Sequence, residues 1–208
     1  MNITDINNYF SYTQAKNKDI DDMIEQIIDD ACKMLGDPAT VRKRIMSASE
    51  DARDADDGQS RLSGEAYITH PIRATEFLMH LKPDLITIQT CLLHDVIEDT
   101  PRTYEDIVDD FDQEVADLCE WLNKVSKVRY QGEERDIATL KKTFLAMARD
   151  LRVIFVKLAD RVHNIQTLSY HPKPEKQHKI ALETMKIYVP IAKKLWLYHF
   201  QLFLENGS

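Results

Sequence analysis

A short segment near the middle of the chain mixes ionisable and aliphatic side chains, and it reads Leu92-Leu93-His94-Asp95-Val96-Ile97-Glu98-Asp99-Thr100. If this segment is helical, His94 lies one turn before Glu98 and Asp95 lies one turn before Asp99, so the two pairs occupy adjoining faces. Charged groups on a largely buried helix require a partner, and carboxylates near a helix C-terminus oppose the helix dipole. A bound metal ion would pair with the buried charges and would offset the unfavourable interaction with the helix dipole. An exposed acidic turn ending at Pro101 is the alternative, and the residues alone leave both open.

A second candidate is Asp160, which lies in an apolar stretch of the chain. Asp160, Asn164 and Thr167 follow one another at i, i+4 and i+7, which places one polar line on an otherwise apolar helix. An internal salt bridge to Lys157 or Arg161 would also explain this carboxylate. Adjacent residues on a helix point away from each other, so Arg161 is the poorer partner.

The elements that must position these residues are predicted to be helices almost throughout. Apolar spacing predicts a helix over about 20–35, which ends at Gly36-Asp37-Pro38, a second from 38, and others over 71–81 and 84–99, the last capped by Asp84. Further helices are predicted from 103, where Thr103-Tyr104-Glu105-Asp106 resembles a capping box, over 115–125, from 137 and through 153–160. Loops are predicted near 60–64 and over 127–135. The run 153–156 could be a short strand, but it continues unbroken into 157–160, so a buried helix is preferred. Pro71 favours a helix start, and a lone histidine such as His70 just before it is more often a cap than a ligand.

The last predicted helix is long. It is expected to be kinked at Pro190 because proline removes a helical hydrogen bond. Its inward-facing residues are predicted to be Ile180, Met185, Ile187 and Ile191.

The composition is that of a globular protein with one domain. The chain has 208 residues, 43% of them hydrophobic and 30% charged, and its 5 glycines argue against a β-rich or glycine-loop architecture. A net charge of −8 makes DNA or a membrane surface a poor partner. The three cysteines form no CxxC pair, and the chain shows neither a signal peptide nor a membrane-length apolar run. We therefore expect one all-α, cytoplasmic domain.

The order of the candidate residues resembles a known family. His70, then His94-Asp95, then Asp160 is similar to the pattern of HD-domain metal-dependent phosphohydrolases. Longer segments look like successive motifs of the hydrolase domain of RelA/SpoT homologues, and they read Arg61-Leu62-Ser63-Gly64-Glu65-Ala66-Tyr67-Ile68-Thr69-His70-Pro71, Leu93-His94-Asp95-Val96-Ile97-Glu98-Asp99-Thr100, Lys157-Leu158-Ala159-Asp160-Arg161-Val162-His163-Asn164 and Ile187-Tyr188-Val189-Pro190-Ile191-Ala192. The resemblance covers about residues 20–195. It implies a single HD-domain helical bundle over 1–208 without a synthetase domain, as in the small alarmone hydrolases.

The resemblance also implies a site and a reaction. It assigns one divalent metal ion, Mn²⁺ in this family, to His70, His94, Asp95 and Asp160, an acid/base pair to Glu98 and Asp99, and substrate binding to Arg61, Asn164 and Thr167. Such a mixed donor set also suits Fe²⁺ or Zn²⁺, and the metal would lower the pKa of a water molecule. The implied reaction is hydrolysis of the 3′-pyrophosphate of the alarmone (p)ppGpp to GDP or GTP and pyrophosphate. Arg161 and His163 are interpreted as supporting structure.

The sequence departs from the family pattern at several positions, and the lysine that helps the family to read the guanine is one of the residues replaced. Leu62 stands where the family usually has a lysine, Ile165-Gln166 replaces Met-Arg, and Trp196 replaces a glycine. One alternative is therefore an antitoxin-type hydrolase that neutralises a toxic alarmone synthetase, including one that removes pyrophosphate from the 3′ end of tRNA. A general HD nucleotide phosphohydrolase is a second alternative. Basic residues could contact tRNA, although solvated helix faces are the preferred explanation, and they are Lys124, Lys127, Arg129, Lys141 and Lys142.

Overall fold

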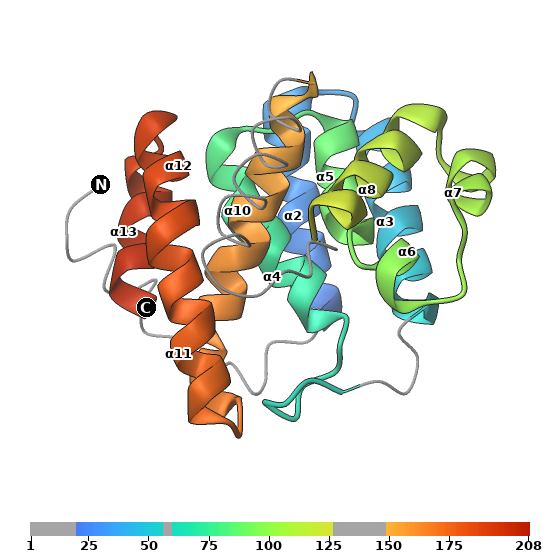
Figure 1. Cartoon of the computed structure of the whole chain (residues 1–208). Helices are drawn as coiled ribbons and strands as arrows, with labels where there is room; N and C mark the ends of the chain where they lie inside the picture. Colours follow the sequence, from blue (N-terminus) through green and yellow to red (C-terminus); the bar gives the residue numbers. More distant parts are fainter. Residues whose placement is uncertain (1–19, 56–59, 127–148) are drawn as a thin grey trace.

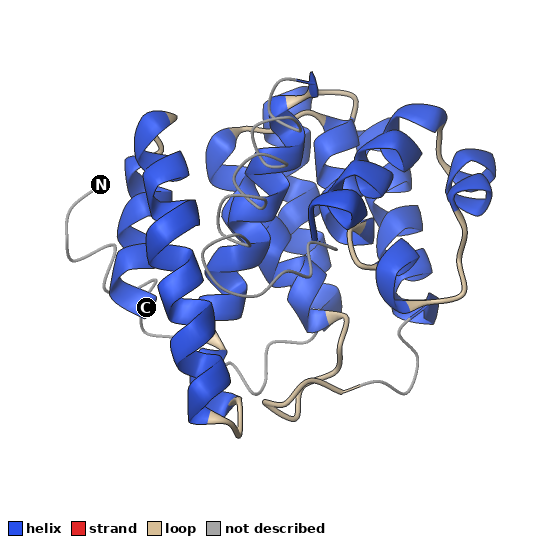
Figure 2. Ribbon diagram, in the orientation of Figure 1, coloured by secondary structure: helices blue, strands red, loops and turns tan. Residues whose placement is uncertain are grey.

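A computed structural model of the chain describes residues 20–55, 60–126 and 149–208. Within these ranges every regular element is a helix (Figure 2), and one isolated antiparallel bridge joins Ser60 to Ala66. The all-α prediction is therefore confirmed. The helix predicted from residue 137 and the loop over 127–135 lie outside the described residues. Among the helices that are described, none has the length and apolarity needed to cross a membrane.

The first two helices form as the apolar spacing predicts. Helix α2 (Ile20–Leu35) buries one stripe of side chains, made of Met23, Ile24, Ile27, Ile28 and Ala31. Gly36 and Asp37 then adopt left-handed backbone conformations, with φ angles of 73° and 42°, and turn the chain into α3 (Pro38–Ala55). Glycine is favoured at this position after a helix because it has no Cβ to clash. The predicted break at Gly36-Asp37-Pro38 is thus confirmed.

Three helices in the middle of the molecule carry or directly precede most of the candidate residues (Figure 1). Helix α4 (Thr69–Leu78), extended by the 3₁₀ turn η1 (Met79–Leu81), packs against both α5 (Leu85–Leu93) and α10 (Leu151–Gln166). Helices α4 and α5 contribute side chains to two hydrophobic cores, one shared with α2 and α3 and the other with α10, α12 and α13. The predicted cap of α5 is present, because the Asp84 side chain accepts a hydrogen bond from the Thr87 amide. The preference for a buried helix over a strand at 153–160 is confirmed by α10.

The predicted continuous helix over 84–99 is wrong, because α5 ends at Leu93 and a new short helix, α6 (Val96–Asp99), follows a turn at His94 and Asp95. Nδ1 of His94 lies 2.7 Å from the carbonyl oxygen of Cys91. A continuing α-helix would use that carbonyl as the acceptor for the backbone N–H of Asp95. The histidine ring thus occupies a backbone acceptor at the point where the helix is interrupted.

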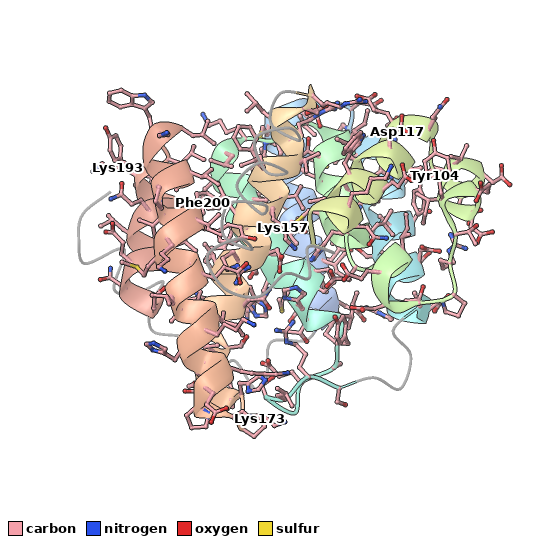
Figure 3. The ribbon with its side chains drawn as sticks, in the orientation of Figure 1. Tyr104, Asp117, Lys157, Lys173, Lys193 and Phe200 are labelled. Atoms are coloured by element: carbon pink, nitrogen blue, oxygen red, sulfur yellow. The ribbon has the colours of Figure 1, made fainter. Side chains whose placement is uncertain are left out.

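Two helices cover the outer side of α5 and α6. Helix α7 (Tyr104–Asp110) begins with the predicted capping box, in which Thr103 and Asp106 exchange side-chain and backbone hydrogen bonds. Helix α8 (Gln113–Ser126) packs on α7, and the Tyr104 hydroxyl donates to Oδ1 of Asp117 over 2.8 Å (Figure 3).

The C-terminal helices form a layer beside α10 (Figure 1). Helix α11 (Pro174–Glu183) continues through a π-helical turn, η3 (Thr184–Tyr188), into α12 (Val189–Lys194), and α13 (Tyr198–Gly207) follows as a further helix that the sequence did not predict. A kink was expected at Pro190, and the helix has its π turn just before this residue. A π turn is one way in which helices accommodate an interruption of their hydrogen bonding. The wider turn changes which side chains face inward. The inward prediction for Met185 is accordingly wrong, since this residue is 43% exposed, whereas Ile187 and Ile191 are buried.

Candidate metal centre and active site

An open cavity of about 530 Å³ brings the candidate residues together. Eight of the nine residues predicted to form the site line it, and these are Arg61, His70, Asp95, Glu98, Asp99, Asp160, Asn164 and Thr167. The ninth, His94, is buried beside the cavity at 3% exposure. Helices α4, α6 and α10, the turn after α5 and the loop before α4 supply these side chains, so the site depends on how distant segments pack.

Two imidazoles and two carboxylates converge at the buried side of the cavity. Nε2 of His70 lies 3.2 Å from Oδ1 of Asp160 and 3.5 Å from Oδ2 of Asp95. Nε2 of His94 lies 3.2 Å from Oδ1 of Asp95 and 3.9 Å from Oδ1 of Asp160. The potential ligand atoms of His70, His94 and Asp95 all lie within 4.8 Å of one another. Nitrogen and oxygen donors gathered in this way can hold a divalent metal ion.

The protonation of His94 fits a metal ligand. The Cys91 carbonyl can only accept, so Nδ1 of His94 must carry the proton in their 2.7 Å hydrogen bond. In the neutral ring Nε2 then carries the lone pair, and this buried atom has no hydrogen-bond partner among the described residues. Histidine ligands of metals commonly donate their second ring N–H to a carbonyl in this manner. A buried lone pair facing two carboxylates is an arrangement that a cation would complete.

Asp160 takes part in both of the interactions that its sequence position left open. Its Oδ2 accepts from Nζ of Lys157 over 2.6 Å, while its Oδ1 faces the two histidines and accepts from the Asn164 amide. Burial alone would raise the pKa of this carboxyl, but the charge of Lys157 and the hydrogen bond with His70 hold the pKa well below its usual range. Asp160 is thus an anion at neutral pH. Arg161 points elsewhere, as expected, toward Glu183 at 3.6 Å.

His70 is held as a neutral ring. Burial lowers the pKa of the His70 imidazole, and the nearby carboxylates Asp160 and Asp95 only partly oppose this effect. A metal ligand must be unprotonated at the binding nitrogen, so a lowered pKa favours the ligand role over the capping role that a lone histidine suggests.

The residues predicted to bind substrate form one hydrogen-bonded group next to Asp160, at the C-terminal end of α10. Nη2 of Arg61 donates to Oδ1 of Asn164 over 3.1 Å and to Oγ1 of Thr167 over 3.3 Å. The loop that carries Arg61 turns back on itself through Gly64, whose φ of 86° favours glycine, and the Arg61 amide donates to the Glu65 carbonyl over 2.9 Å. The predicted loop near 60–64 therefore fixes the backbone from which Arg61 reaches α10.

The two acidic residues predicted as an acid/base pair lie at the exposed rim of the cavity. The backbone amides of Glu98 and Asp99 both donate to the carbonyl of Asp95, over 3.0 and 2.9 Å. The carboxylates are thereby tied to the backbone of a candidate metal ligand. Oδ2 of Asp99 accepts from the Tyr67 hydroxyl over 2.8 Å, and that hydroxyl lies 3.4 Å from Oδ2 of Asp95.

Three further residues of the site are Tyr67, Lys157 and His163. Lys157 lies on α10 one turn before Asp160 (Figure 3), the spacing from which a salt bridge was considered. Tyr67 lies in the turn just before α4, and no pattern in the sequence indicated its contact with Asp99. His163, interpreted as supporting structure, has its Nδ1 2.7 Å from Nδ1 of His70, and no pattern in the sequence indicated this ring contact either.

Replacing Tyr67 by phenylalanine is expected to reduce kcat roughly tenfold and to change metal affinity less, because one hydrogen bond to a charged group is worth about 1.5–3 kcal/mol at most. The measurement is turnover at saturating metal together with calorimetric metal binding. The matched control is Tyr104→Phe, which removes a tyrosine–aspartate hydrogen bond of the same 2.8 Å length from α7. Equal activity of the two variants would show that Tyr67 does not support Asp99.

Comparisons with known proteins place this site in a family. The family model described as HD domain matches residues 48–196. The chain is 44% identical over 165 residues to the bifunctional (p)ppGpp synthase/hydrolase SpoT of Escherichia coli (strain K12), an alignment that covers 79% of this chain and 23% of the relative. It is 42% identical over 191 residues to a guanosine-3′,5′-bis(diphosphate) 3′-pyrophosphohydrolase of Spiroplasma citri, covering 91% of this chain and 25% of the relative. The chain thus spans about a quarter of the length of these curated relatives.

A solved structure of a metazoan ortholog of SpoT, described as hydrolysing ppGpp, has the same fold. Its TM-score to this chain is 0.62 at 20% sequence identity, and the match covers 79% of this chain and 93% of the other. The family match includes every residue of the candidate site, from Arg61 to Thr167. The chain belongs to the HD-domain family.

Proposed function

We propose that this chain hydrolyses the 3′-pyrophosphate of (p)ppGpp to GDP or GTP and pyrophosphate, and that it does so with bound Mn²⁺. The observation that carries the proposal is the convergence, in one cavity, of the buried imidazole–carboxylate group, two acidic side chains at the rim and Arg61, which is hydrogen-bonded to Asn164. The names of the curated relatives, which include (p)ppGpp hydrolases, support the substrate. That residues 1–208 form a single HD domain stays a prediction.

The metal would be held by His70, His94, Asp95 and Asp160. The buried Nε2 of His94, unpartnered among the described residues, supports this assignment, and so does the anionic state of Asp160. A divalent ion at this place lowers the pKa of a water molecule and offsets negative charge on the phosphoryl oxygens. Lys157 balances part of the carboxylate charge, so the site has fewer net negative charges than its two carboxylates alone would give.

Two acidic side chains of the site would transfer the protons that the reaction requires. A water oxygen forms a bond to the phosphorus next to O3′ of the ribose, and the bond between that phosphorus and O3′ breaks. One proton must leave the water and one must reach O3′, so a base and an acid are both required. Glu98 and Asp99 are suited to these roles because they line the cavity and are exposed to solvent, with which they can exchange protons.

The group formed by Arg61, Asn164 and Thr167 would bind the nucleoside. The Arg61 guanidinium, held by Asn164 and Thr167, offers a planar cation on which a base can stack. A cavity of about 530 Å³ is within the range that small-molecule sites occupy, roughly 300–1,000 Å³.

The test is pyrophosphate release from ppGpp by the purified chain with Mn²⁺, with EDTA and with an Asp160→Asn variant as controls. Release that requires metal and disappears in the variant supports the proposal. A folded, metal-loaded chain that releases no pyrophosphate would overturn it.

A second candidate substrate is a tRNA whose 3′ end carries pyrophosphate, and it would fit an antitoxin that counteracts a toxic alarmone synthetase. The observation that favours it is Leu62, which lines the cavity at 64% exposure where the family usually has a lysine. Of the basic residues considered as tRNA contacts, Lys124 pairs with Glu120 at 2.8 Å, and the other four, at 127, 129, 141 and 142, lie outside the described residues. Turnover of pyrophosphorylated tRNA that falls steeply with salt would support this candidate, because polyanion binding depends strongly on salt.

Replacing Leu62 by lysine is expected to raise the preference for ppGpp over its adenine analogue roughly tenfold, as one charge-assisted hydrogen bond of about 1.5 kcal/mol would do. The measurement is the ratio of kcat/KM for the two nucleotides. Leu62→Met is the matched control, since it lengthens the side chain without adding a donor. An unchanged ratio in the lysine variant would show that position 62 does not read the base.

A further inference from the structure

The imidazole rings of His70 and His163 contact each other through their Nδ1 atoms. Their Nδ1 atoms are 2.7 Å apart, and their ring centroids lie 4.9 Å apart with the planes tilted by 33°. Both residues are buried, at 2% and 0% exposure. Two nitrogens at this distance form a hydrogen bond only if one carries a proton and the other offers a lone pair. One ring therefore donates and the other accepts.

This partner differs from the partner of His94. The Cys91 carbonyl can only accept, so it fixes the proton of His94 on Nδ1 whether or not a metal is bound. An imidazole can do either, and Nε2 of His163 has no hydrogen-bond partner within the described parts of the chain that would decide its tautomer. His163 is thus able to present Nδ1 to His70 as a donor or as an acceptor.

Two arrangements of the pair follow. In the first, Nδ1–H of His163 donates to Nδ1 of His70, and Nε2–H of His70 donates to Oδ1 of Asp160, which is 3.2 Å away. In the second, Nδ1–H of His70 donates to Nδ1 of His163, and the lone pair on Nε2 of His70 faces Asp95 and Asp160. Only the second arrangement leaves His70 able to bind a cation through Nε2.

We propose that His163 is a positioning residue of the metal centre, which accepts the Nδ1 proton of His70 and thereby directs the Nε2 lone pair of His70 into the site. This inference rests on the proposed metal site. On metal binding the proton between the two Nδ1 atoms moves from His163 to His70. Nε2 of His70 gives up a proton to water, and Nε2 of His163 takes one from water. The pair keeps two protons, so both rings stay neutral.

The surroundings of His163 agree with a neutral ring. Burial, followed by the neighbouring His70 ring and the charges of Arg61 and Arg73, holds the pKa of the His163 imidazole well below its usual range, while Asp160 acts in the opposite direction.

The variants His163→Asn and His163→Leu test the proposal as a matched pair. The two side chains have nearly the same shape, but only asparagine can place an oxygen where Nδ1 accepts from His70. We expect the leucine variant to bind Zn²⁺ about 10–100-fold more weakly than the native chain, the usual effect of losing such a partner. The asparagine variant is expected to stay within about fivefold. Affinities that fall equally in both variants, or in neither, would overturn the proposal.

A measurement on the native chain does not depend on how the variants fold. Nitrogen-15 NMR of the imidazoles, without metal and with Zn²⁺ as a diamagnetic probe, reports which ring nitrogen carries each proton. We expect Zn²⁺ to leave His70 protonated at Nδ1 and His163 protonated at Nε2. A His163 ring that keeps its proton on Nδ1 with Zn²⁺ bound refutes the positioning role alone. A native chain that binds no Zn²⁺ refutes the metal site as well.

Discussion

Replacing Asp160 by asparagine is expected to weaken Mn²⁺ binding more than 100-fold and to lower kcat/KM for ppGpp at least 10³-fold, while the chain keeps its helices. The carboxylate contributes through both oxygens, since Oδ1 faces His70 and His94 and Oδ2 pairs with Lys157 at 2.6 Å. An amide removes the negative charge and leaves the Lys157 ammonium largely buried beside the metal position. That unpaired charge would repel a divalent cation, and removing one member of a buried pair costs about 3–5 kcal/mol of folding free energy.

The double variant Asp160→Asn with Lys157→Met separates these two effects. It removes both members of the buried pair, so the free energy of unfolding should return toward the native value. Metal binding should not return, because the ligand oxygen is still missing its charge. Calorimetry with Mn²⁺ and urea unfolding measure the two quantities. Asp112→Asn, which removes an ion pair of the same 2.6 Å length with Arg44 outside the cavity, is the control for charge removal in general. Native Mn²⁺ affinity in the Asp160→Asn variant would contradict the assignment.

The fold could be predicted from the sequence where interactions between neighbouring residues determine it. The apolar spacing of α2, the capping box at Thr103 and the cap at Asp84 depend only on neighbouring residues, and all three are present as expected. The break after Leu93 could not be predicted, because it involves a histidine ring that takes a backbone acceptor. The π turn before Pro190 widens the helix, so periodicity assigned Met185 to the wrong face.

For the site, too, some features could be predicted from the sequence and others could not. The order of the motifs indicated site residues from three segments of the chain, and the structure places them in or beside one cavity. A sequence pattern does not show which side chains from different segments contact one another. The contact of Tyr67 with Asp99 spans 32 residues, and that of His70 with His163 spans 93. Such contacts arise from the packing of α4 against α5 and α10, which follows from the burial of two cores rather than from any local signal.

Replacing Glu98 by glutamine is expected to leave metal affinity within about threefold and to lower kcat by about 10²–10⁴, the usual contribution of a general acid or base. Glu98 lines the cavity but belongs to α6, one turn beyond the buried ligands, so the amide should not disturb them. Single-turnover pyrophosphate release at saturating Mn²⁺ measures the chemical step. Glu105→Gln, an exposed acidic residue in the first turn of α7, is the matched control and should retain native turnover.

The variant Asp99→Asn tests whether one or both of the rim carboxylates transfer protons. Asp99 accepts the Tyr67 hydroxyl, which commits one of its oxygens, and the backbone amides of both Glu98 and Asp99 donate to the Asp95 carbonyl. If one residue is the base and the other only supports it, the larger loss of kcat should occur in the Glu98 variant, and the loss from Asp99→Asn should be close to that from Tyr67→Phe. If both transfer protons, each variant should lose at least 10²-fold, and the Tyr67 variant should be much milder than either. Native kcat in the Glu98 variant would remove this residue from the mechanism and leave Asp99 as the rim carboxylate for proton transfer.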